Sequence, residues 1–126
     1  MSGSIGIQKL EHYTINTTDV AGTVKFYENA IGLKNGDRPA FDFPGAWLYC
    51  AETPVVHLIG VDSQAAQGTG TLDHIAFRAG DYRSYQKRLR QQGIPFTERD
   101  VPGMTLHQMF LKDPVGVTIE LNFWDE

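Results

Sequence analysis

The chain has 126 residues, enough for one compact domain with a core and too few for two ordinary domains. Its net charge of −4 without a basic block argues against nucleic-acid binding, and its 41% hydrophobic content is typical of globular soluble proteins. Residues 1–9 have no signal-peptide pattern, no apolar run approaches about 20 residues, and the lone Cys50 forms no internal disulfide. We therefore expect a cytoplasmic protein without membrane contact.

The first half of the sequence predicts a strand, a helix and then further strands. Residues 9–17 alternate like a strand with two different faces. Asp19 and the two threonines before it can cap a helix that Gly32 ends. Residues 33–36 form a short extension and turn, 38–45 an irregular loop or broken edge strand, and 46–50 and 55–60 a hairpin.

The second half repeats this order. It predicts a strand at 72–79, a helix at 82–92 and three strands at 94–98, 106–111 and 117–123. Residues 62–70, rich in Gly, Ala, Gln and Ser, are the expected linker. We thus predict one domain made of two modules, residues 8–61 and 71–124.

A repeated string aligns the two halves. Leu10–Glu11–His12 recurs 62 positions later as Leu72–Asp73–His74. When the hairpins of the two halves are aligned, His57 corresponds to Glu120. Strand alternation places all four residues (His12, His57, His74 and Glu120) on the face of the strands that points away from the helices.

These four residues predict one divalent metal ion per site. Imidazole and carboxylate groups suit Fe²⁺, Ni²⁺, Zn²⁺, Mn²⁺ or Co²⁺, and the sequence does not choose among them. Each histidine alone also fits a hydrogen-bonded, half-buried residue, so the prediction depends on the joint pattern. His107 is out of phase with this face and is expected at the surface or in a second layer.

The repeat, the helix end Phe26–Leu33 and the closing segment Lys112–Leu121 resemble the vicinal oxygen chelate superfamily, which includes glyoxalase I, extradiol dioxygenases, methylmalonyl-CoA epimerase and the fosfomycin and bleomycin resistance proteins. The resemblance covers about residues 8–123. It implies an α+β fold in which two βαβββ modules form a curved mixed-sheet cup with the helices outside, and it implies a homodimer.

The resemblance also places His12, His74 and Glu120 on the ligand positions of the superfamily. His57 takes the remaining position, where glyoxalase I has a glutamate and the epimerase a glutamine. This departure argues against glyoxalase I itself, because the second glutamate for proton transfer is missing. Two arrangements stay open, namely a four-ligand site and a triad of two histidines and one carboxylate with His57 nearby.

Three functions follow as hypotheses. The first is a metal-dependent lyase or isomerase that chelates neighbouring oxygens of a small substrate, with Glu120 as ligand and catalytic base. The second is an Fe²⁺ extradiol ring-cleavage dioxygenase, and the third is a non-catalytic small-molecule-binding or drug-resistance protein. Arg78 is the expected anion anchor, and the expected pocket lining consists of Trp47, Tyr49, Gln108 and Phe110.

Overall fold

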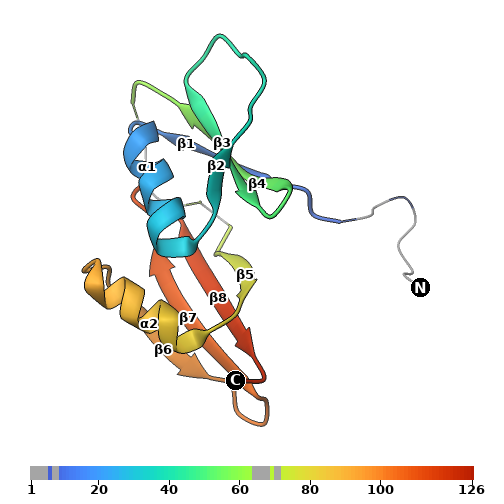
Figure 1. Cartoon of the computed structure of the whole chain (residues 1–126), viewed down its shortest axis with the longest axis vertical. Coiled ribbons are helices and arrows are strands. Elements are labelled where there is room, and N and C mark those ends of the chain that lie inside the picture. Colours follow the sequence, from blue (N-terminus) through green and yellow to red (C-terminus); the bar gives the residue numbers. More distant parts are fainter. Residues whose placement is uncertain (1–5, 7–8, 64–68, 70–71) are drawn as a thin grey trace.

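The structure is a computed structural model, and it describes Gly6, residues 9–63, Thr69 and residues 72–126. Each half of the chain forms a four-stranded mixed sheet with a helix on one side, and the two halves lie one above the other in Figure 1. The predicted α+β class with two βαβββ modules and curved sheets is confirmed. Most of the predicted linker at 62–70 lies outside the described residues.

The first sheet has the strand order β1-β4-β3-β2, with β1 parallel to β4. Its elements follow the chain as β1 (Tyr13–Thr17), α1 (Val20–Phe26), η1 (Tyr27–Ile31), β2 (Lys34–Gly36), β3 (Gly45–Cys50) and β4 (Thr53–Gly60).

The second sheet has the equivalent order β5-β8-β7-β6, with β5 parallel to β8. Its elements are β5 (Ile75–Ala79), α2 (Tyr82–Gln91), β6 (Thr97–Asp100), β7 (Leu106–Lys112) and β8 (Thr118–Trp124). The two halves therefore repeat one topology, as the repeated string predicts.

Three strands begin three or four residues later than predicted. The first strands of the two halves are shorter than predicted, so His12 and His74 lie just before β1 and β5. The strand expected at 94–98 instead begins at Thr97. Ile94 and Phe96 pack against the core from the segment before it, and their apolar side chains gave the appearance of a strand.

The helix of the first half begins and ends as its sequence predicts. The Asp19 carboxylate accepts a hydrogen bond from the Gly22 N–H at 2.9 Å and so caps α1. A π-helical turn, η1, continues α1 and ends at Gly32, whose φ of 102° is the left-handed conformation that favours glycine.

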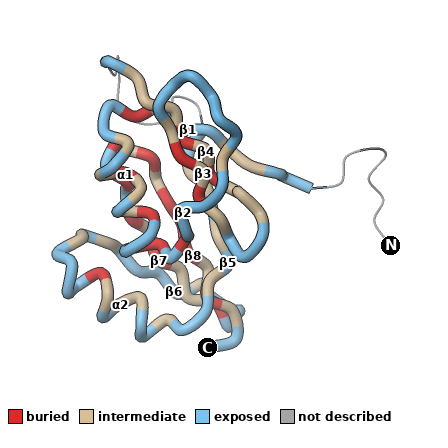
Figure 2. The backbone as a smooth tube through the Cα atoms, turned by 45° about the horizontal axis from the view of Figure 1, so that its top comes forward, coloured by how far each residue is buried: buried red, intermediate tan, exposed pale blue. Residues whose placement is uncertain are grey.

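One hydrophobic core lies between the helices and the sheets and joins the two halves (Figure 2). Leu48 and Leu58 contribute to it from the first sheet, and Met109 and Ile119 from the second. The opposite strand faces carry the predicted site residues, and most of their side chains are half-buried or exposed, whereas Glu120 is buried.

Candidate metal centre and adjoining pocket

The strand register confirms that His57 and Glu120 are equivalent positions. His57 lies between Thr14 of β1 and Trp47 of β3, whereas Glu120 lies between Ala76 of β5 and Phe110 of β7. Thr14 and Ala76 each follow a histidine of the repeated string by two residues. Each sheet therefore carries one pair of candidate ligands at the same place.

In the first half, His12 and His57 form a stack with Trp47. The ring centroids of His12 and His57 are 3.7 Å apart with an interplanar angle of 12°, and the Trp47 ring lies 4.1 Å from His57 on β3. His57 Nε2 donates to the backbone oxygen of Pro54 at 3.1 Å. Burial, and secondarily the neighbouring His12, lower the pKa of His57, which favours a neutral imidazole.

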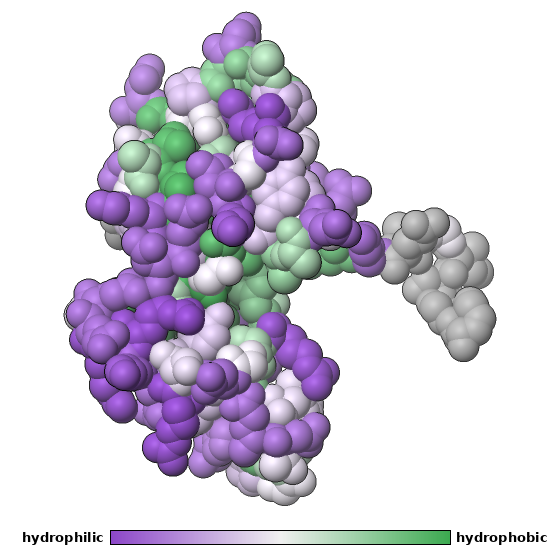
Figure 3. All heavy atoms as spheres, in the orientation of Figure 1, coloured by the Kyte–Doolittle hydropathy of each residue, from purple (hydrophilic) through white to green (hydrophobic). Residues whose placement is uncertain are grey.

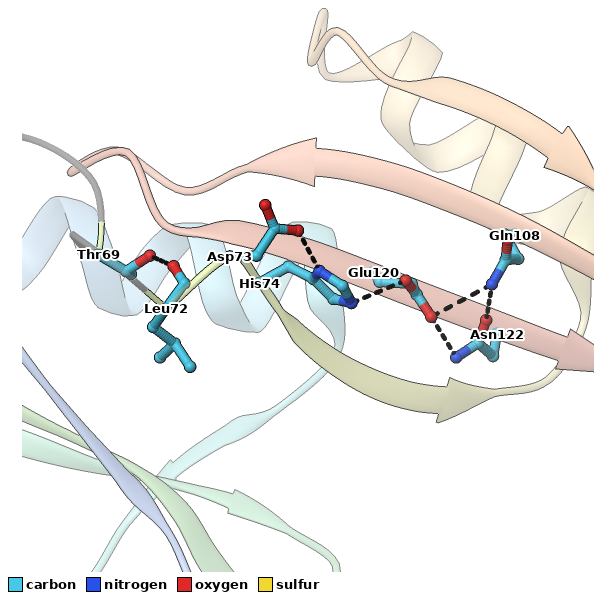
Figure 4. Close-up of polar contacts among 7 residues, drawn as sticks. All are labelled: Thr69, Leu72, Asp73, His74, Gln108, Glu120 and Asn122. Carbon is cyan, nitrogen blue, oxygen red and sulfur yellow. Dashed lines mark hydrogen bonds and ion pairs between the residues drawn. The ribbon is translucent and has the colours of Figure 1, made fainter.

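In the second half, His74 lies between two carboxylates. Its Nδ1 is 2.6 Å from Asp73 Oδ2, and its Nε2 is 3.1 Å from Glu120 Oε1 (Figure 4). The Asp73 hydrogen bond, and secondarily the Glu120 charge, raise the pKa of His74. Without a cation, this arrangement favours the imidazolium form.

The other oxygen of Glu120 is held by two amides. Asn122 Nδ2 donates to Glu120 Oε2 at 2.8 Å, and Gln108 Nε2 lies 3.3 Å from the same oxygen and 3.1 Å from Asn122 Oδ1 (Figure 4). The glutamate is only 9% exposed, so these bonds compensate part of its desolvation. Sequence reasoning missed Asn122, although its place two residues after Glu120 on one strand face was available as a signal.

The donor chemistry fits a divalent cation at both pairs. Ligating histidines usually donate their second ring nitrogen to an oxygen, which fixes the tautomer. Here the carboxylates of Glu11 and Asp73 engage Nδ1 of His12 and His74, at 3.0 and 2.6 Å, and the Pro54 oxygen engages Nε2 of His57. These contacts suit ligation through Nε2 of His12 and His74 and through Nδ1 of His57.

The structure does not bring the four predicted ligands into one cluster. Among the described residues, no group of three or more His, Cys, Asp or Glu side chains lies close enough to hold a metal. The chain instead presents a two-histidine pair and a histidine–glutamate pair. Whether the four residues share one ion therefore stays a prediction.

The remaining predicted site residues lie on the same open faces as these pairs. Gln108 contacts Glu120, and Phe110 of β7 lies opposite Glu120 in the strand register. Arg78 pairs with Asn122 in the register, and its guanidinium lies 5.8 Å from the Trp124 ring centroid. The Tyr49 hydroxyl is engaged in the fold, because it donates to the backbone oxygen of Asp37 at 2.7 Å. No observation tests substrate contact at these positions.

A pocket of about 150 Å³ adjoins the His57 stack, and sequence reasoning missed most of its lining. The loop before β3 contributes Arg38, Phe41 and Phe43 to it, and strands β1, β3 and β4 contribute the rest of the lining, including Trp47 and His57. The signal was an arginine and two phenylalanines within six residues of a segment predicted only as an irregular loop or broken edge strand. His107, by contrast, lies outside both pairs, where it is half-buried, stacks on Tyr82 of α2 and contacts Asp100.

Comparison with known proteins identifies the family of the chain. A sequence model of the Glyoxalase/Bleomycin resistance protein/Dioxygenase superfamily matches residues 9–121. The chain belongs to this superfamily. A search of curated proteins finds no match to the sequence.

Solved structures of the superfamily share the fold at low identity. The fosfomycin resistance protein FosX from Listeria monocytogenes is 20% identical, with a TM-score of 0.74, and the match covers 93% of each chain. Lactoylglutathione lyase from Agrobacterium tumefaciens is 16% identical, with a TM-score of 0.69 and coverage of 94% of this chain and 96% of that chain. TnmS3, an antibiotic-binding protein from Streptomyces, is 20% identical, with a TM-score of 0.71 and coverage of 97% and 100%. Similarity at this level establishes the fold and leaves the reaction open.

The superfamily contains enzymes and binding proteins on one scaffold, so the chemistry of this chain must be argued from its own residues. Among the described residues, no helix is long and apolar enough to cross a bilayer.

Proposed function

We propose that the protein is a divalent-metal-dependent enzyme that binds two neighbouring oxygens of a small organic substrate and carries out lyase or isomerase chemistry. The observation that carries this proposal is the matched pair of donor sets, His12 with His57 and His74 with Glu120, at equivalent register positions. A divalent ion held by these groups would supply electrostatic stabilisation of the negative charge that develops on substrate oxygens.

Glu120 is the proton-transfer group of this scheme. Gln108 and Asn122 hold its Oε2, so Oε1, which faces His74, is the oxygen left to serve as the ligand or to take a proton from substrate. Arg78, the register neighbour of Asn122, is the cation that would receive an anionic substrate group.

We further propose that a second copy of the chain brings the two pairs together in a homodimer. Leu10 and Leu72, at matching positions of the repeated string, are 82% and 55% exposed. In the view of Figure 3, apolar residues also gather between the two lobes. A second copy that covered these leucines, each two positions before a candidate histidine, would bury exposed apolar surface and so stabilise the dimer.

Metal titration of single-ligand variants tests the site. We expect His12→Asn, His74→Asn and Glu120→Gln each to weaken Zn²⁺ or Ni²⁺ binding at least about 100-fold, and the matched control His107→Asn to leave it unchanged. His57→Asn decides between the two open arrangements, because a four-ligand site predicts a comparable loss and a triad predicts a small one. If Glu120→Gln retains full metal affinity and turnover, the proposal is wrong.

Substrate screening then separates the reactions. Turnover of a hemithioacetal with Ni²⁺ or Zn²⁺ and no oxygen uptake supports the lyase or isomerase. Catechol-dependent oxygen uptake with Fe²⁺ supports the extradiol dioxygenase instead, with the same residues holding the ion.

A non-catalytic binding protein is the second candidate function. The aromatic pocket beside His57 favours it, since such a pocket can bind a ligand without a reaction. It predicts that the purified protein binds small aromatic molecules, and that added divalent metal does not raise its melting temperature.

A further inference from the structure

The pocket beside His57 has a distinctive lining. Phe41 and Phe43 stack with ring centroids 4.9 Å apart, and Phe41 lies 6.4 Å from Trp47. Thr14 and Ile59 close the pocket from β1 and β4. Three aromatic rings thus line one small space on the open face of the first sheet.

The size of the pocket limits what enters it. Its volume of about 150 Å³ matches that of a cavity able to hold a single benzene ring. Aromatic rings prefer offset-stacked or edge-to-face contacts with other rings, at centroid distances of about 4.5–7 Å. The lining therefore suits one planar ring better than a branched aliphatic group.

Arg38 gives the pocket a positive charge. Its guanidinium carbon lies 4.9 Å from the Phe41 ring centroid and 5.0 Å from that of Phe43, and Nη2 donates to the Phe43 backbone oxygen at 2.9 Å. A guanidinium has five N–H donors in a planar fork, so this bond leaves most of the fork for a ligand. No carboxylate is present among the described residues that line the pocket.

The backbone beneath Arg38 is adapted to its position. A Cβ atom on Gly45 would lie 2.9 Å from Arg38 Nη2 and 2.2 Å from the backbone oxygen of Leu58. Position 45 therefore requires glycine, chiefly because a side chain would collide with the Leu58 backbone oxygen, and the guanidinium lies against this glycine.

We propose that this pocket binds a single planar aromatic ring that carries a carboxylate, with the ring against Trp47, Phe41 and Phe43 and the carboxylate on Arg38. The proposal rests on the proposed function in one respect: because the pocket adjoins His57, the aromatic acid that it binds is taken to be the substrate. Carboxylate recognition by a guanidinium fork is the strongest form of this contact, because the hydrogen bonds are charge-assisted. The substrate class that follows is an aromatic acid whose reacting oxygens extend from the ring toward the candidate ligands.

Benzoate binding to the metal-free full chain tests this proposal by NMR titration. Excluding metal removes direct carboxylate–metal binding, so the pocket is measured alone. We expect benzoate to shift the indole N–H signal of Trp47 and to leave that of Trp124, on the other sheet, in place. Benzyl alcohol, which has the ring without the charge, and cyclohexanecarboxylate, which has the charge without the planar ring, should each bind about tenfold more weakly.

Variants of exposed or half-buried residues outside the core identify the contacts. Arg38→Gln should weaken benzoate binding about tenfold and leave benzyl alcohol binding unchanged, and the matched control Arg83→Gln on α2 should affect neither. Phe41→Leu should weaken both ring compounds. Equal benzoate affinity in Arg38→Gln and wild type, or no shift of the Trp47 signal at about 20 mM benzoate, overturns the proposal. Metal titration tests the metal site separately. Failure of benzoate binding can therefore be told apart from failure of the proposed metal-dependent function.

Discussion

Tyr27 of the first half donates its hydroxyl proton to Asp113 of the second half, with 2.9 Å between Oη and Oδ2. Both residues are buried, and 86 positions of sequence separate them. The second oxygen of Asp113 accepts backbone N–H bonds from Val115 and Val117 at 3.0 and 2.8 Å. One carboxylate therefore orders the turn between β7 and β8 and ties it to η1 of the other half.

Removing the tyrosine hydroxyl should destabilise the protein. We expect Tyr27→Phe to lower the free energy of unfolding by about 1–3 kcal/mol, because a buried carboxylate loses a donor that water cannot replace. Urea unfolding measures this change. Tyr49→Phe is the matched control, since its hydroxyl bond to Asp37 is exposed, and a loss as large as that of Tyr27→Phe would contradict the argument.

Asp113 should also give stability a specific pH dependence. Burial raises the pKa of this carboxyl, and the hydrogen bonds from Val117, Tyr27 and Val115 only partly oppose the shift. The folded state then binds the proton more tightly than the unfolded chain, so the contribution of Asp113 to stability falls as pH rises from the ordinary carboxyl pKa through the raised one.

The comparison with Asp113→Asn isolates this contribution, because the other carboxyl groups are common to both proteins. The free energy of unfolding of wild type minus that of the variant should decrease between about pH 3.5 and pH 6.5. An increase over this range would show that the hydrogen bonds outweigh burial.

His107 should stabilise the second sheet at low pH. Its Nδ1 lies 2.5 Å from Asp100 Oδ1 across β6 and β7, and this bond is the main cause of a raised pKa. For a histidine with a raised pKa, the stabilisation is fully present below the ordinary value of about 6.5 and is lost as pH rises through the raised value.

An NMR pH titration of the imidazole signals measures the pKa of His107 directly. Asp100→Asn should return the pKa of His107 toward its ordinary value and should lower the melting temperature more at about pH 5.5 than at about pH 8.5. Asp62→Asn, outside the strands, is the control. A pKa of His107 that is the same in Asp100→Asn and wild type would refute the assignment.

Much of the fold was accessible from the sequence because local patterns specify it. The alignment of the two hairpins predicted that His57 and Glu120 are equivalent, and the register confirms this. Capping by Asp19 and termination at Gly32 follow from short-range chemistry and were likewise predicted.

The contacts that local patterns do not specify were missed. Tyr27 reads as one more apolar position of a helix and Asp113 as a turn residue, so their hydrogen bond depends on how the halves pack. The same limit explains why the predicted four-residue centre appears here as two pairs. Strand alternation says which face a side chain occupies, and it says nothing about the distance between two sheets.

The acidic residues before the two histidines should act as positioning residues. Glu11 and Asp73 engage Nδ1 of His12 and His74, which orients Nε2 for a ligand. We expect Glu11→Ala and Asp73→Ala each to weaken Zn²⁺ binding about 10–100-fold in a chelator competition assay. Glu52→Ala, in the exposed turn between β3 and β4, should have no effect on Zn²⁺ binding. Circular dichroism should show that Glu11→Ala and Asp73→Ala still fold.

Mixing two defective variants should restore metal binding if the pairs from two subunits share one ion. His12→Asn carries an intact His74–Glu120 pair, and Glu120→Gln carries an intact His12–His57 pair. In a mixed dimer with shared sites, one site combines both defects and the other combines both intact pairs. Random reassociation makes about half of the dimers mixed, so roughly a quarter of wild-type binding capacity should return.

This experiment separates shared sites from sites within one chain. If each chain completed its own site, every site in the mixture would retain one defect, and mixing would restore nothing. Mixing His74→Asn with Glu120→Gln is the matched control, because both defects lie in the same half and no intact second-half pair exists in either chain. Recovery in the first mixture without recovery in the control would therefore assign one ion to two subunits, whereas equal results in both mixtures would refute the shared site.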